Sequence, residues 1–161
     1  MLILLSPAKS LDFSESAVTA HSVPELLEET DSLIGTLREK SQKEVADLMG
    51  LSAKLAELNF DRYQSYSRPL SPDENAKQAL LAFKGDVYRD WPLDSYDGQD
   101  FEYAQSHLRI LSGLYGALRP LDLIRPYRLE MGTRLQTDRG TNLYQFWGST
   151  ITDSLNQTLS E

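Results

Sequence analysis

The chain opens on five consecutive apolar residues, Met1–Leu5, which are followed at once by Ser6-Pro7. A continuous apolar run of this length, bounded by a turn signal, is typical of a buried β-strand. The run is too short for a signal peptide and has no basic stretch before it, so a cytoplasmic location is the simplest expectation. The fold must therefore contain a sheet, and the first strand of that sheet is expected in the core.

Helix signals dominate the residues that follow a polar, Ser-rich stretch over 11–21. Ser22-Val-Pro-Glu25 combines a capping residue, a proline in the first turn and a glutamate at the third helical position, and predicts a helix to about Lys40. Ser41-Gln-Lys-Glu44 repeats the capping box and predicts a short helix that ends near Gly50. Ser52 is expected to cap a third helix.

The second half of the chain mixes helix and strand signals. We expect helices over 71–81, 100–111 and 141–159, strand-like runs over 82–88 and 127–131, and a tight turn over 112–116. The segment 117–124 is interrupted by Pro120 and is expected to be a short turn or helix piece. For 161 residues, this pattern predicts one domain of mixed α/β (α+β) class, with a central sheet and several helices.

Several function classes are excluded by composition. The chain has no cysteine, which excludes disulfides and thiolate chemistry, and its two histidines, His21 and His107, have no ligand-like spacing. It contains no Walker loop, dinucleotide-binding glycine pattern, zinc motif or catalytic triad. No apolar run approaches the ~20 residues of a membrane helix. We therefore expect no cofactor, no metal site, no membrane partner and no catalytic residue.

Charge is unevenly distributed along the chain. The net charge is −8, which argues against non-specific binding to phosphate. Only the window 107–134 is cationic: against Asp122 and Glu130 it holds five arginines, Arg109, Arg119, Arg125, Arg128 and Arg134. On a shared face, four or five of these guanidinium groups would form a phosphate-binding groove, with a slope of about −4 in log K against log salt. The alternative is internal pairing with the two acidic residues.

The same window contains a glycine-bracketed turn, in which Gly113 and Gly116 enclose two residues. An apolar helix, such a turn and a second helical piece outline a helix-hairpin-helix element, in which backbone N–H groups face a phosphate. This turn has one residue more between its glycines than the usual hairpin, and Pro120 shortens the second helix. The alternative is a buried tight turn, and the tyrosines of the window could stack on unpaired bases or lie in the core.

Two lysines are candidates for an anion site. Lys9 ends the segment Ser6-Pro-Ala-Lys9, at the carboxyl end of the first strand, where α/β folds place ligand contacts. Lys84 stands in the strand-like run over 82–88. Both lysines could reach one anion, or pair with Asp12 or Asp86 instead. A Ser-x-x-Lys spacing also occurs in serine acyl-transfer enzymes, but there it begins a helix and needs partner motifs, so we expect no nucleophilic serine.

Four blocks in this order and spacing closely resemble the YaaA family of bacterial peroxide stress resistance proteins (UPF0246 type): LLSPAKSLD, LLAFKGDVY, LRILSGLYGALRPLDLIRPYRLEMG and LYQFWG. The resemblance implies a mixed α/β fold with a helix-hairpin-helix-like element and a basic cleft. It also implies protection from hydrogen peroxide, through limits on free intracellular iron and oxidative DNA damage, and binding to double-stranded DNA. Family members continue past LYQFWG, so 1–161 is expected to be the N-terminal part of a longer single-domain protein.

The hairpin and the cationic window supply the candidate DNA-binding residues, namely Arg109, Ser112, Gly113, Tyr115, Gly116, Arg119 and Arg128. Three functions remain open from the sequence. The first is a DNA-binding stress protein without turnover. The second is an enzyme acting on a small anionic or nucleotide-like substrate, with Lys9, Lys84, Asp86 and Arg128 around the strand ends. The third is a protein-interaction or iron-handling module.

Overall fold

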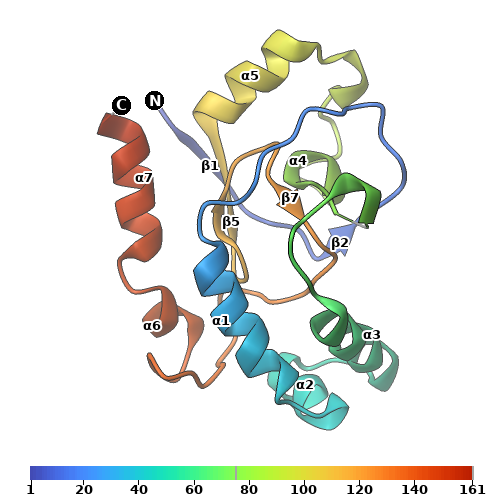
Figure 1. Cartoon of the computed structure of the whole chain (residues 1–161), viewed down its shortest axis with the longest axis vertical. Helices are drawn as coiled ribbons and strands as arrows, with labels where there is room; N and C mark the ends of the chain where they lie inside the picture. Colours follow the sequence, from blue (N-terminus) through green and yellow to red (C-terminus); the bar gives the residue numbers. More distant parts are fainter. Residues whose placement is uncertain (75, 161) are drawn as a thin grey trace.

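A computed structural model describes residues 1–74 and 76–160 and has the expected mixed α/β fold (Figure 1). Its largest sheet has the order β1-β5-β6, made of β1 (Ile3–Leu5), β5 (Leu108–Ser112) and β6 (Gly116–Leu118). β1 runs parallel to β5 and β5 runs antiparallel to β6. Two antiparallel pairs accompany this sheet: β2 (Ser10–Leu11) with β4 (Phe83–Lys84), and β3 (Lys77–Gln78) with β7 (Leu123–Ile124).

Three helices follow β2, namely α1 (Leu27–Arg38), α2 (Gln42–Met49) and α3 (Ala53–Ser65). The capping box at Ser41 and the cap at Ser52 are both present as predicted, and α2 ends at Gly50. α1 begins later than predicted, because Ser22 forms an isolated bridge with Asp122 instead of capping the helix. α2 and α3 lie at one end of the molecule, and α5 (Gly98–His107) lies at the opposite end (Figure 1).

Elements between 71 and 111 are shorter than predicted. The helix over 71–81 is wrong where the chain is described: Pro72–Glu74 is a single 3-10 turn, Lys77–Gln78 is β3, and α4 covers only Ala79–Ala82. The strand over 82–88 is confirmed only at β4, and a second 3-10 turn, Leu93–Ser95, precedes α5. The helix over 100–111 ends at His107, because the next five residues join the sheet as β5.

The C-terminal part also differs from the elements predicted from the sequence. Residues 127–131 form no strand. The single helix predicted over 141–159 is two helices, α6 (Leu143–Trp147) and α7 (Thr150–Ser160), which are separated at Gly148. One core cluster takes in residues from most of these elements, including Leu33, Tyr63, Ile110, Tyr115 and Phe146.

The predicted helix-hairpin-helix is instead a β-hairpin. β5 and β6 flank the turn, with Ser112 opposite Gly116, and no helix stands on either side of it. A short apolar run does not distinguish a buried helix from a buried strand. The sequence pattern therefore predicts a helix up to residue 111, where the chain forms a strand instead. Both positions require glycine, for different reasons. A Cβ on Gly113 would lie 2.2 Å from the Leu129 carbonyl oxygen, and Gly116 has a φ of 76°, which other residues rarely adopt.

Candidate anion-binding site

The turn predicted to contact phosphate lies inside the protein. Ser112, Gly113, Tyr115 and Gly116 are all buried. The Ser112 hydroxyl accepts hydrogen bonds from the backbone N–H groups of Leu114 and Tyr115, at 3.3 and 3.0 Å, and so binds two of the groups expected to face a phosphate. The structure thus corresponds to the buried-turn alternative.

Neighbouring aromatic side chains hold this turn in place. The indole N–H of Trp147 donates to the Gly113 carbonyl at 3.0 Å, and the hydroxyls of Tyr127 and Ser112 share a hydrogen bond of 2.6 Å. Tyr115 and Tyr127 pack edge to face, with ring centroids 5.3 Å apart. Burial raises the pKa of both tyrosines above the ordinary value, so they stay protonated, and neither ring is open to stacking by a base.

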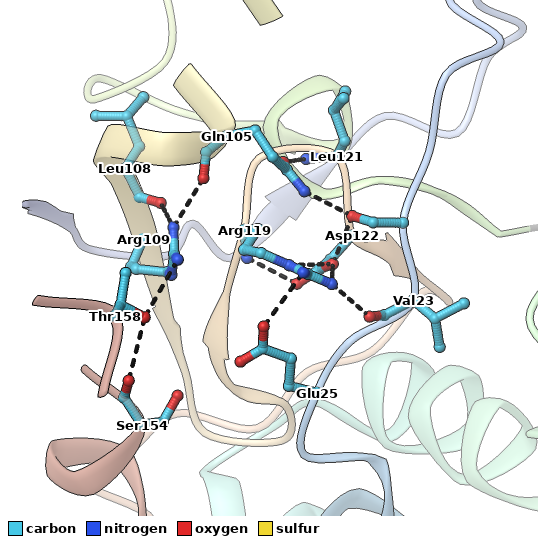
Figure 2. A network of polar contacts seen from close by, with 11 residues as sticks. Val23, Glu25, Gln105, Leu108, Arg109, Arg119, Leu121, Asp122, Ser154 and Thr158 are labelled. Carbon is cyan, nitrogen blue, oxygen red and sulfur yellow. Dashed lines mark hydrogen bonds and ion pairs between the residues drawn. The ribbon is translucent and has the colours of Figure 1, made fainter. Parts of the chain in front are cut away.

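Arg109 joins β5 to two helices (Figure 2). It is only 6% exposed, and its guanidinium donates to the carbonyls of Gln105 and Leu108 at 2.9 and 2.7 Å. A longer contact of 3.4 Å reaches the Thr158 hydroxyl on α7. This arginine supports the packing of α5 and α7 and does not face a groove.

The guanidinium of Arg119 is also bound by groups of the protein itself. Its guanidinium donates to Asp122 at 2.9 Å and to the Val23 carbonyl at 2.8 Å, and it pairs with Glu25 at 3.2 Å (Figure 2). Asp122 is fully buried and also accepts a hydrogen bond of 2.7 Å from the Ser22 hydroxyl. The internal-pairing alternative therefore describes Arg119.

Two further arginines of the window, Arg125 and Arg134, lie apart from these. Arg125 donates to the Ser67 hydroxyl at 2.7 Å. Arg134 is exposed and lines a surface hollow together with Lys40 and Asp47 of the α2 region. The arginines of the cationic window therefore do not converge on one groove beside the turn.

Arg128 meets Lys9 at a separate pocket. A cavity of about 280 Å³ is lined by Pro7–Lys9, which follow β1, and by the segment 127–131. Glu130 lies between the two cations, with its carboxylate 3.2 Å from the Lys9 Nζ and 3.7 Å from an Arg128 nitrogen. Two positive charges share one carboxylate, so the pocket carries a net positive charge despite the acidic chain as a whole.

The guanidinium of Arg128 is incompletely paired. Its Nε is buried and has no hydrogen-bond partner among residues 1–74 and 76–160. Tyr63 holds the backbone by donating its hydroxyl proton to the Arg128 carbonyl, which keeps the residue in place without using the guanidinium. A buried donor without an acceptor costs free energy, and such groups often mark a place where a ligand or water binds.

Lys84 lies near this pocket but in a different cavity. β2 pairs Ser10 with Lys84, and these two residues line a neighbouring cavity of about 530 Å³. The Lys84 Nζ is 3.7 Å from the carboxylate of Asp12. Asp86, the other candidate partner, pairs with Arg89 instead. The structure therefore brings Lys9 and Arg128 together at one pocket, whereas Lys84 lies across the β2–β4 pair from Ser10 and lines a different cavity.

The carboxylate of Asp12 is stabilised in its charged form. Hydrogen bonds from Ser14 are the main cause that lowers the pKa of Asp12 to about 2, and the positive charges of Lys77 and Lys84 add to this effect. The sequence pattern does not identify Lys77 as a site residue, because the helix it predicts over 71–81 gives no reason to place Lys77 beside Asp12. It is 8% exposed, and burial lowers the pKa of its ammonium group.

The comparison with known proteins agrees with the blocks identified in the sequence. A family model described as "Peroxide stress protein YaaA" matches residues 1–161. The chain belongs to the YaaA family. A UPF0246 protein of Aromatoleum aromaticum is 57% identical over 161 residues, which cover 99% of this chain and 61% of the relative. The chain thus spans about three fifths of the length of this YaaA-family relative.

Two findings bear on other expectations for this YaaA-family chain. Within residues 1–74 and 76–160, no helix has the length and apolar character needed to cross a membrane. The same residues contain no group of three or more His, Asp or Glu side chains placed to hold a metal ion.

Proposed function

We propose that this YaaA-family protein acts in the response to hydrogen peroxide by binding double-stranded DNA, and that a backbone phosphate occupies the Lys9–Arg128 pocket. The observation that carries the proposal is the meeting of these two cations, from segments far apart in sequence, at an open pocket. Phosphate contacts of this kind supply most of the affinity of non-specific DNA binding. DNA binding is also the activity that the family resemblance implies.

The charges of the pocket suit a phosphate. The Arg128 guanidinium presents a planar set of donors that matches phosphate oxygens, and the Lys9 ammonium is a flexible point charge. The Lys9 side chain is 63% exposed and the Glu130 side chain 46%, so the carboxylate can move aside for a ligand and the lysine can adjust to it. A phosphate oxygen would then take the place of the Glu130 carboxylate between the two cations.

The expected dependence of DNA binding on salt is weaker than the slope of about −4 that four or five arginine contacts would give. Arg109 and Arg119 are bound internally, which leaves Lys9, Arg128 and the nearby Lys84 as phosphate contacts. Two or three contacts predict a slope of about −2 to −3 in log K against log salt. The net charge of −8 repels DNA elsewhere on this chain, so we expect binding to need low salt.

Under this proposal the protein protects DNA by occupying it and turns over no substrate.

A gel-shift titration of duplex DNA at low salt tests the proposal. We expect the wild-type protein to shift the duplex and Lys9→Glu to weaken binding by about tenfold, roughly 1.4 kcal/mol. Lys54→Glu is the matched control, because it makes the same charge change at an exposed position on α3, outside the pocket. The proposal fails if wild-type protein gives no shift at low salt, or if the two variants bind equally well.

A small anionic or nucleotide-like ligand is the second candidate for the same pocket. The observation that favours it is the size of the cavity, about 280 Å³, which suits a phosphate with part of a nucleoside better than a duplex. Calorimetric titration with a mononucleotide distinguishes the two. Saturable binding of the mononucleotide, abolished by Lys9→Glu, together with no shift of duplex DNA would favour the small ligand.

A further inference from the structure

β1 has the composition of a core strand but lies at an exposed edge. The residues from Met1 to Leu5 are all apolar, yet Ile3 is 45% exposed and Leu4 is 48% exposed. Successive residues of a strand point to opposite faces, so the exposure of both shows that β1 is uncovered on its two faces. The predicted strand is confirmed, but its predicted burial is wrong for this chain.

The two edges of the sheet differ. β6, at one edge, is buried along all three residues, and the side chains of Leu26 and Trp147 lie against Gly116. β1, at the other edge, pairs only with β5 among the described residues. Native proteins rarely leave an apolar edge strand open, because its free N–H and C=O groups attract other strands.

α7 also carries exposed apolar surface, and one contact links it to the strand beside β1. Leu4 lies opposite Arg109 in the ladder, and Arg109 contacts Thr158 on α7. α7 has no buried residue at all, and its Leu159 is 59% exposed. Figure 1 draws the two termini next to each other at this end of the molecule. We give the exposed apolar residues of α7 and of the N-terminal segment that contains β1 the name β1–α7 surface: Met1, Ile3, Leu4 and Leu159.

We propose that the β1–α7 surface is the docking site for the part of the family polypeptide outside these 161 residues, and that a strand of that part pairs with the free edge of β1. The matched relative is long enough to contain such a strand outside the matched region, because this chain covers only 61% of its length. A parallel sheet buried on both faces requires strands of continuous apolar composition, which β1 has. The added strand would extend the sheet beyond β1, and its neighbouring residues would cover Leu159.

Hydrogen exchange provides the test. The 161-residue chain is compared with a fusion that adds the remaining two fifths of the Aromatoleum relative. We expect the β1 amides that point away from β5 to exchange at least about tenfold more slowly in the fusion. Equal exchange in both proteins overturns the proposal, and so does protection already present in the 161-residue chain, which would indicate pairing between copies.

A substitution gives a second readout. In the fusion, Leu4→Glu should lower the Tm by more than about 5 °C, because it buries a charge at the new strand pair. In the 161-residue chain the same change should have little effect, because Leu4 is half exposed there. Val87→Glu is the matched control, since Val87 is exposed to a similar degree away from this surface, and should be neutral in both proteins. Equal effects of Leu4→Glu in the two proteins would contradict the proposal.

Discussion

Arg119 and Arg128 come from the same cationic window and have similar exposure, 25% and 21% of their side chains, yet their surroundings differ. Arg119 pairs with Glu25 at 3.2 Å and, more closely, with Asp122 at 2.9 Å, and Asp122 is fully buried and fixed by further hydrogen bonds. The counter-ion of Arg128 is the half-exposed Glu130, at 3.7 Å, and one guanidinium nitrogen has no partner. The burial of the counter-ion, rather than that of the arginine, separates a structural guanidinium from one that can accept a ligand.

The largest effect expected from this comparison is on stability. Asp122→Ala removes the buried carboxylate that accepts hydrogen bonds from Arg119 and Ser22, and should cost about 4 kcal/mol in the free energy of unfolding, because it leaves several donors without their buried acceptor. Urea denaturation measures the loss. Asp86→Ala, which breaks an exposed pair with Arg89, should cause no measurable loss. A small effect of Asp122→Ala would show that Arg119 is not structural.

The position of Arg128 depends on the turn that packs against its segment. In Gly113→Ala the new Cβ would collide with the Leu129 carbonyl, so we expect a loss of about 3 kcal/mol. Gly35→Ala in α1 has open space around its Cβ and should stabilise the protein by about 0.5 kcal/mol. Thermal and urea unfolding of both variants should therefore change in opposite directions. Equal changes would contradict the close packing of the turn.

Ligand binding should separate the two arginines. Arg128→Gln is expected to weaken duplex binding about tenfold at low salt, roughly 1.4 kcal/mol, because it removes one phosphate contact. Arg119→Gln should reduce stability, while the fraction that remains folded binds DNA as well as the wild type does. Binding is measured by fluorescence anisotropy at a temperature where both variants are folded. Equal affinities of the two variants would remove the distinction drawn between these arginines.

A smaller effect, of opposite sign, is expected at the counter-ion. Glu130→Gln removes the carboxylate that occupies the site between Lys9 and Arg128, and should strengthen duplex binding by about threefold, roughly 0.7 kcal/mol. The same anisotropy titration detects this change. Glu57→Gln, an exposed glutamate on α3 outside the pocket, controls for the change in net charge. An equal gain in both variants would mean that Glu130 does not compete with the ligand.

The smallest effect concerns the acid side of the stability curve. The pKa of Asp12 is lowered to about 2, so its charged form contributes stability above its unfolded pKa of about 4, and this contribution is lost as the pH falls toward 2. The Tm difference between wild type and Asp12→Asn should therefore be largest above pH 5 and vanish near pH 2. A difference that is independent of pH would show that the Asp12 charge is not involved.

Features decided by neighbouring residues could be predicted from the sequence. The caps at Ser41 and Ser52 were placed correctly, because a hydroxyl reaches N–H groups only two or three residues away. The first strand, the tight turn at 112–116 and the family membership were likewise evident, because each depends on a contiguous run of residues. The expectation of one cleft shared by Lys9, Lys84 and Arg128 agrees with the structure only in part, because Lys9 and Arg128 line one pocket and Lys84 lines another.

Pairing between distant segments could not be predicted from the sequence. Leu108–Ser112 has the spacing of a helix end, yet it is a strand because β1 and β6 both pair with it. Ser22 has the sequence of a cap, yet Asp122 binds it from a hundred residues away. Whether an arginine pairs inside or lines a pocket depends on which carboxylate lies next to it and how deeply that carboxylate is buried. Only the tertiary structure decides this, because burial is a property of the packed chain and not of any local sequence.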